Sequence, residues 1–206
     1  MCILSRHGRD HSIPPTQVNN RANIWAIREL GCEFILATTA CGSLREEIRR
    51  GDVVFPDQFI DFTRHRAITF FEKFEGGQLN HTPMPDPFHP FLREKLVAAA
   101  TKKGLRFHSS GTVVTIEGPR FSTRAESNLF RAWGADVINM STAPECILAN
   151  ELDIPYAAVA LSTDYDCWKS DEEAVTWEEV LKVFNRNVEN VIGLLLETIV
   201  SLKQST

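Results

Sequence analysis

The chain has 206 residues, of which 43% are hydrophobic and 24% are charged, and its formal net charge is −5. This length and composition are typical of one globular domain. The absence of a long basic run argues against nucleic acid as a partner. The absence of any run of about 18 apolar residues argues against a membrane span.

The cysteines are five in number, they are scattered, and no two form a C-x-x-C pair. This pattern predicts reduced thiols in a cytoplasmic protein. Residues 1–5 are too short for a signal peptide and run directly into Arg6, which agrees with the same localisation.

The apolar pattern predicts strands that alternate with helices. In chain order we expect a strand at 2–5, a helix at 17–30, a strand at 33–38, an extended segment at 53–62, a long loop at 64–90, a helix at 90–103, a strand at 113–116, a helix at 122–133, a strand at 136–139, a helix at 144–152, a strand at 156–163 and a helix at 176–202. This alternation predicts a single-domain α/β fold with a largely parallel central sheet.

The segment TIEGPRFSTRAE, residues 115–126, carries the most informative local motif. Gly118-Pro119 ends the strand with a loop, and Thr123 with Glu126 fits a capping box at a helix start. Phe121 and Ser122 therefore stand at a helix N-terminus, where a flat ring and an anion can be held together. An ordinary strand, turn and helix with a core Phe121 explains the segment equally well.

Polar side chains follow each of the predicted strands. Ligands of open α/β sheets bind outside the carboxyl ends of the strands, so we expect these side chains to meet in one cleft. They are Arg6 and His7 after the first strand, Thr39 and Ala40 after the second, Phe121 and Ser122, then Met140 and Ser141, and finally Asp164 and Asp166.

The set of Arg6, His7, Thr39 and Ala40 suits an oxyanion such as phosphate. An arginine offers a planar fork of donors, Thr39 adds a hydroxyl, and Ala40 beside Gly42 leaves room for backbone N–H groups. The alternatives are a surface ion pair for Arg6 and a structural role for His7.

Asp164 and Asp166 stand two residues apart after an apolar strand, so an extended chain puts both carboxylates on one side. One of these carboxyl groups could form a hydrogen bond with N7 of a departing purine. The other could accept a hydrogen bond from the 6-amino group of the same purine. Burial and a like-charged neighbour would raise the pKa of such a group. The alternatives are a pair that caps a loop, or two ligands of a metal, for which no third hard ligand stands nearby.

Taken in order, the motifs around Phe121-Ser122, Asn139-Met140-Ser141 and Thr163-Asp164-Tyr165-Asp166 resemble the purine nucleoside phosphorylase family, and most closely its methylthioadenosine phosphorylase branch. The resemblance covers nearly the whole chain. It implies a mixed, largely parallel central sheet flanked by helices. It also implies cleavage of a purine nucleoside by inorganic phosphate as co-substrate, with no metal or organic cofactor, in a homo-oligomer that is commonly a trimer.

The resemblance also implies roles for particular residues. Asp164 is the expected catalytic residue. The expected phosphate contacts are Arg6, His7, Thr39, Ala40, Ser122 and Ser141. The expected substrate contacts are Phe121 against the base, Met140 under the ribose, Thr163, Asp164, Tyr165 and Asp166 around adenine, Trp177, Val180 and Leu181 around the 5′ group, and His81 reaching the site of a neighbouring subunit.

Two departures from the family define the alternatives. The family opens with a strand and a Gly-Gly-Thr-Gly phosphate loop that this sequence lacks, so a truncated, non-catalytic purine binder is one alternative. Trp177 replaces a smaller apolar residue, so a nucleoside phosphorylase for another 5′ substituent is a second alternative.

An alternative of a different class is a phosphatase, because Arg6-His7-Gly8 resembles the histidine phosphatases. No other histidine follows a strand in the way that activity requires, and Asp164 and Asp166 would stay unexplained.

Overall fold

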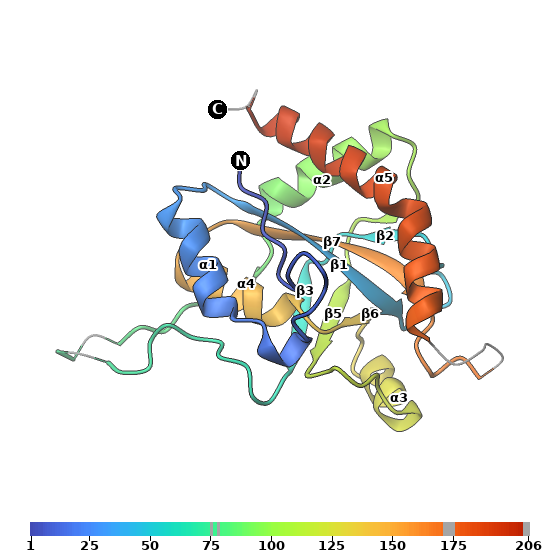
Figure 1. The fold of residues 1–206 in the computed structure, drawn as a ribbon, viewed down its shortest axis with the longest axis horizontal. Helices are drawn as coiled ribbons and strands as arrows, with labels where there is room; N and C mark the ends of the chain where they lie inside the picture. Colours follow the sequence, from blue (N-terminus) through green and yellow to red (C-terminus); the bar gives the residue numbers. More distant parts are fainter. Residues whose placement is uncertain (75, 78, 171–175, 204–206) are drawn as a thin grey trace.

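The computed structural model describes residues 1–74, 76–77, 79–170 and 176–203, apart from the side chains of Trp177 and Glu179 (Figure 1). The strands are β1 (Ile35–Ser43), β2 (Val53–Val54), β3 (Gln58–Phe62), β4 (Phe107–His108), β5 (Thr112–Ile116), β6 (Val137–Asn139) and β7 (Tyr156–Asp164). The helices are α1 (Asn20–Glu29), α2 (Pro90–Lys102), α3 (Arg124–Ala132), α4 (Thr142–Glu151) and α5 (Trp177–Lys203), with a 3-10 turn η1 (Pro15–Gln17) before α1.

The strands form one seven-stranded sheet in the order β3-β5-β6-β1-β7-β2-β4. The pairs β3–β5, β5–β6, β1–β7 and β2–β4 are parallel, whereas β1–β6 and β2–β7 are antiparallel. This arrangement confirms the mixed, largely parallel sheet that the sequence and the resemblance predicted.

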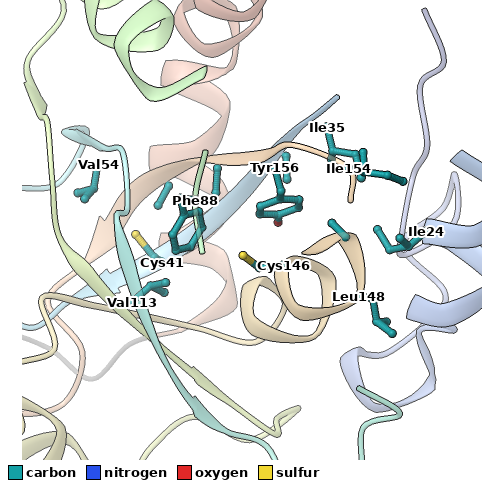
Figure 2. Packing of buried hydrophobic residues seen from close by; sticks show 14 of the residues in the cluster. Ile24, Ile35, Cys41, Val54, Phe88, Val113, Cys146, Leu148, Ile154 and Tyr156 are labelled. Atoms are coloured by element: carbon teal, nitrogen blue, oxygen red, sulfur yellow. The ribbon is translucent and has the colours of Figure 1, made fainter. Parts of the chain in front are cut away.

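Strand β7 shows how helices cover both faces of the sheet. Its side chains alternate between the two faces. Tyr156 and Ala158 pack with α1 and α4, a cluster drawn in Figure 2, whereas Ala157 and Val159 pack with α2 and α5. Every residue of β7 is buried, as expected for a strand with helices on both sides. The polar residues Thr163 and Asp164 at its end are therefore held by a rigid support.

The expected strand at 2–5 is wrong. Ile3 is 85% exposed, and no strand precedes β1 in the part of the chain that the structure describes. Residues 5–13 instead form a hydrogen-bonded loop, in which Gly8 N–H donates to Ser5 O and Ile13 N–H donates to His7 O. The apolar triplet at 2–4 is too short to fix a register with a neighbouring strand.

The other differences concern element bounds. The helix expected from residue 17 begins at Asn20, because the side chain of Asn19 accepts a hydrogen bond from Ala22 N–H and caps the helix there. The extended segment 53–62 is two strands, β2 and β3, that lie far apart in the sheet order. Pro56 between them has no N–H to give a neighbouring strand. The short strand β4 was not predicted.

The long loop was predicted correctly. Between Phe62 and Pro90 the described residues contain neither a helix nor a strand, and the segment projects from the body of the molecule at the left of Figure 1. Among the described residues, no helix is long and apolar enough to cross a membrane.

Candidate active site

A cavity of about 650 Å³ opens at the ends of the central strands. It brings together thirteen of the predicted site residues, contributed by the loop before α1, by β1, by the segments after β5 and β6, by the end of β7 and by the start of α5. They are Arg6, His7, Thr39, Ala40, Phe121, Ser122, Met140, Ser141, Thr163, Asp164, Asp166, Val180 and Leu181.

Two predicted residues with described side chains, Tyr165 and His81, are not among those lining it. Tyr165 points away from its aspartate neighbours, donates its hydroxyl to Glu46 O at 3.3 Å and packs against Trp168. The backbone turns directly after β7, with a φ of 31° at Asp166. The expected extended backbone at 164–166 is therefore wrong, although the turn still brings the two carboxylates together. His81 is exposed in the long loop beside Phe74. The side chain of Trp177 lies outside the described residues.

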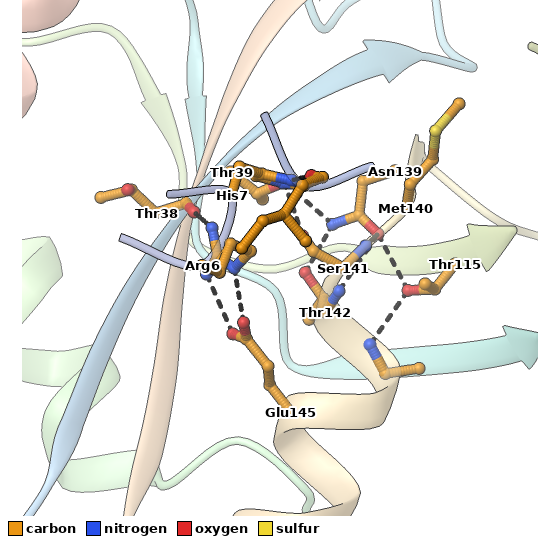
Figure 3. A network of polar contacts seen from close by, with 12 residues as sticks. Arg6, His7, Thr38, Thr39, Thr115, Asn139, Met140, Ser141, Thr142 and Glu145 are labelled. Carbon is orange, nitrogen blue, oxygen red and sulfur yellow. Dashed lines mark hydrogen bonds and ion pairs between the residues drawn. The ribbon is translucent and has the colours of Figure 1, made fainter. Parts of the chain in front are cut away.

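Arg6 is held by a buried carboxylate that the sequence did not point to. Its Nη2 donates to Glu145 Oε2 at 2.9 Å and its Nη1 donates to Thr38 O at 2.8 Å (Figure 3). Tyr156 donates its hydroxyl to the same Glu145 oxygen at 3.0 Å. Burial acts to lower the pKa of Arg6, but Glu145 raises it well above its usual value. The guanidinium is therefore charged and fixed in orientation at the cavity wall.

His7 is anchored through one ring nitrogen. Its Nδ1 lies 2.8 Å from Ile13 O, so this nitrogen carries the proton and donates it to the carbonyl. Its ring stacks on the ring of His11, and the two ring centroids lie 4.5 Å apart. Burial lowers the pKa of His7, and the nearby His11 and Arg6 lower it further. The hydrogen bond to Ile13 and the charge of Glu145 act to raise this pKa, but they do not outweigh the lowering. The ring is therefore neutral at neutral pH, with Nε2 as an acceptor.

Asn139 holds the hydroxyl of Thr39 and the backbone N–H of Ser141 at the cavity. Its Nδ2 donates to Thr39 Oγ1 at 3.3 Å, and its Oδ1 accepts from Thr115 Oγ1 at 2.9 Å (Figure 3). The hydroxyls of Thr39 and Ser141 lie 3.2 Å apart. Because Asn139 is buried at the end of β6, it fixes both Thr39 and the chain leading to Ser141. Sequence reasoning quoted Asn139 in a motif but gave it no role.

The two aspartates lie side by side and are nearly buried. Asp164 accepts hydrogen bonds from Thr163 Oγ1 at 2.8 Å and from Asp166 N at 2.9 Å. Burial raises the pKa of Asp164 to about 6, although these two hydrogen bonds act to lower it. A carboxyl group with this pKa exists in both protonation states near neutral pH, as a general acid requires.

Ser122 does not join the group around Arg6. Its Oγ lies 2.9 and 2.7 Å from the two carboxylate oxygens of Asp166, to which it donates. The hydroxyl therefore holds Asp166 in place on the aspartate side of the cavity, and the phosphate contact expected of Ser122 stays a prediction.

The first turns of α5 close another side of the cavity with apolar groups. Val180 and Leu181 lie there as predicted, and Phe184 one turn further on joins them. Phe184 belonged to the apolar stripe of the predicted helix, but the spacing alone did not separate core positions from cavity positions. Among the described residues, no cluster of His, Cys, Asp and Glu could hold a metal ion.

The family model described as the phosphorylase superfamily matches residues 1–200, so the chain belongs to this family. S-methyl-5′-thioadenosine phosphorylase of Xenopus tropicalis is 54% identical, and the alignment covers 96% of this chain and 72% of that protein. The enzyme of the same name from Danio rerio is 52% identical, with 98% of this chain and 73% of that protein covered.

Solved structures agree with these relatives. A mutant adenosine/methylthioadenosine phosphorylase from Schistosoma mansoni in complex with adenine matches with a TM-score of 0.93 and 43% identity, covering 98% of this chain and 77% of that chain. Together the relatives place this chain in the methylthioadenosine phosphorylase branch of the family. The resemblance drawn from the sequence is confirmed.

Proposed function

We propose that this chain catalyses the phosphorolysis of S-methyl-5′-thioadenosine to adenine and 5-methylthioribose 1-phosphate. The observation that carries the proposal is the buried pair of Asp164 and Asp166, with a pKa of about 6 for Asp164. Several relatives are named for this activity, and the cavity volume suits a nucleoside.

In the proposed reaction a phosphate oxygen bonds to C1′ of the sugar while the bond from C1′ to N9 of adenine breaks. The electron pair of the broken bond stays on the purine. Asp164 gives its proton to N7, so that adenine leaves as a neutral base. The carboxylate of Asp166, fixed by Ser122, accepts a hydrogen bond from the 6-amino group.

The anion would lie beside Arg6, Thr39 and Ser141. The fixed charge of Arg6 favours the transition state. The hydroxyl of Thr39 donates to Ala40 O at 3.0 Å and lies 3.2 Å from that of Ser141, so both hydroxyls rotate toward the anion when it binds. Neutral His7 and Ala40 complete this wall. Inorganic phosphate is thus a co-substrate, and no metal or organic cofactor takes part in the proposed reaction.

Specificity for the 5′ group would come from Val180, Leu181 and Phe184. An apolar wall suits a methylthio group and gives a 5′-hydroxyl no partner. Comparing kcat/KM for methylthioadenosine and adenosine tests this point, and a preference for adenosine would favour the alternative of another 5′ substituent.

The proposed assembly is a homo-oligomer, a trimer by the resemblance, in which His81 of the projecting loop reaches the site of a neighbouring subunit. The proposed setting is purine and methionine salvage in the cytoplasm. Light scattering of the purified chain tests the trimer, and His81→Ala should weaken activity only if the chain is oligomeric.

The remaining alternatives make different predictions. The truncated, non-catalytic reading predicts that adenine binds but phosphate does not, which calorimetry with each ligand separates. The histidine phosphatase alternative is contradicted by membership of the phosphorylase superfamily.

The direct test of the proposed function is adenine release from methylthioadenosine, which must depend on phosphate. Release without phosphate would indicate a hydrolase instead.

A further inference from the structure

Arg66 is a buried arginine that stands outside the cavity. It lies at the start of the long loop, shortly after β3, and only 3% of its side chain is exposed. It is absent from the residues that line the cavity. Burying an arginine is costly unless its charge and its donors are matched, so its partners define what it does.

Those partners lie just beyond the ends of two neighbouring strands, β5 and β6. Arg66 Nε donates to Glu117 Oε1 at 3.0 Å, and Nη2 donates to Glu117 O and, at 3.3 Å, to Met140 O. Glu117 follows β5 and Met140 follows β6. A single guanidinium therefore joins the two chain segments that lead to Phe121 and Ser141 in the cavity.

Glu117 is itself held from the long loop. Its Oε2 accepts hydrogen bonds from the backbone N–H groups of Arg64, at 2.6 Å, and His65, at 3.1 Å. Burial acts to raise the pKa of Glu117, but these hydrogen bonds and Arg66 lower it below its usual value. The carboxylate stays ionised and fastens the beginning of the long loop to the end of β5.

The side chain of Met140 is confined by Gly118. A Cβ on Gly118 would lie 2.5 Å from Met140 Sδ, so the thioether packs directly on the glycine backbone. Arg66 thus holds the main chain of Met140, while Gly118 holds its side chain. Since Met140 lines the cavity, any movement of Arg66 changes the cavity wall without touching the ligand.

We propose that Arg66, through Glu117 and the Met140 carbonyl, is a positioning residue that sets the sugar-facing wall of the cavity and links it to the long loop. This proposal rests on the proposed function and on the place under the ribose that the resemblance implies for Met140. A lysine cannot take over this role, because one ammonium group lacks the planar fork that reaches Glu117 and Met140 together.

The test uses the methyl resonances of methionine, because the chain has only Met1, Met84 and Met140. Protein labelled with ¹³C at the methionine methyl groups is prepared as wild type and as Arg66→Lys. Met140→Leu assigns the Met140 resonance. The matched control is Arg21→Lys, because Arg21 pairs with Glu72 and also ties the long loop, but on the exposed side.

We expect Arg66→Lys to shift the Met140 resonance and to leave that of Met84 in place, whereas Arg21→Lys shifts neither. Titration with methylthioadenosine, followed at Met140, should give a Kd at least about fivefold higher in Arg66→Lys, the equivalent of one lost hydrogen bond. The KM for phosphate should stay within about twofold of the wild-type value.

An unmoved Met140 resonance, or an unchanged Kd, in folded Arg66→Lys would overturn the proposal. Glu117→Gln serves as a second variant, since it leaves both carbonyl contacts of Arg66 and should shift the same resonance by less. Wild-type protein that binds methylthioadenosine but releases no adenine contradicts the proposed function, while the titration still decides the role of Arg66. Wild-type protein that does not bind methylthioadenosine overturns both.

Discussion

Gly42 of β1 and Asp164 of β7 are paired directly across the parallel ladder, at an irregularity that follows Cys41. A Cβ on Gly42 would lie 2.9 Å from Asp164 Oδ1 and 3.0 Å from Ile138 Cγ2. The absence of a side chain at this position leaves the space that the Asp164 carboxyl group occupies.

The first prediction follows from this contact. Gly42→Ala should displace Asp164 and reduce kcat at least about tenfold, because misplacing a catalytic group by a fraction of an ångström raises the barrier by about 1.4 kcal/mol or more. Gly193→Ala in α5 is the matched control. Its Cβ would meet only the flexible end of Lys103, so its kcat should equal that of the wild type. Equal kcat values for the two variants would refute this role of Gly42.

The second prediction concerns stability and pH. Because the pKa of Asp164 is about 6 in the folded protein and its ordinary value is 3.8, the folded state binds a proton that the unfolded chain releases between about pH 4 and pH 6. The contribution of Asp164 to the free energy of unfolding should therefore fall by about 3 kcal/mol as the pH rises through this window.

Asp164→Asn removes this titration. Urea denaturation at several pH values should show the variant gaining about 3 kcal/mol relative to the wild type between pH 4 and pH 7. A stability difference that does not change with pH would show that Asp164 titrates normally.

The third prediction separates a buried ion pair from an exposed one. Glu145→Gln leaves the charge of Arg6 without its carboxylate, so the free energy of unfolding should fall by about 3–5 kcal/mol. Glu126→Gln breaks the exposed pair with Arg120 and should cost at most about 1 kcal/mol, since glutamine also serves in a capping box. Chemical denaturation measures both, and equal losses would contradict the assigned burial of Glu145.

The fourth prediction concerns the apolar wall. Leu181→Ser should lower the ratio of kcat/KM for methylthioadenosine to kcat/KM for adenosine about tenfold, because an apolar contact with the 5′ group is worth about 1–3 kcal/mol. Leu196→Ser, at an exposed position of the same helix, is the control and should leave the ratio unchanged. A ratio unaffected by Leu181→Ser would remove this residue from the 5′ subsite.

Features that depend on neighbouring residues in the sequence were predicted correctly. The loop at Gly118-Pro119 and the capping box of Thr123 and Glu126 are both present, with Thr123 Oγ1 accepting from Glu126 N–H at 3.2 Å. Asp164 and Asp166 meet as predicted, but through a turn in which Asp166 N–H donates to Asp164 Oδ1, and not through the extended backbone that the prediction assumed. Local turn chemistry suffices for such features.

Features that depend on distant contacts were missed. Glu145 is separated from Arg6 by 139 positions, and its helix reads as an ordinary buried segment, so nothing local marks it as the partner of Arg6. Arg66 lies in a polar loop with no periodic pattern. The contact of Ser122 with Asp166, 44 positions further along the chain, was likewise not predicted. In each case the partner is supplied by the sheet topology.

In the proposed reaction, protonated Asp164 drives the loss of adenine from methylthioadenosine when phosphate attacks. The most direct measurement is adenine release by the wild type and by Asp164→Asn, with and without phosphate. We expect release that requires phosphate, that declines as the pH rises above about 6, and that falls at least about 100-fold in the variant. Release that ignores phosphate, or that survives in Asp164→Asn, would contradict it.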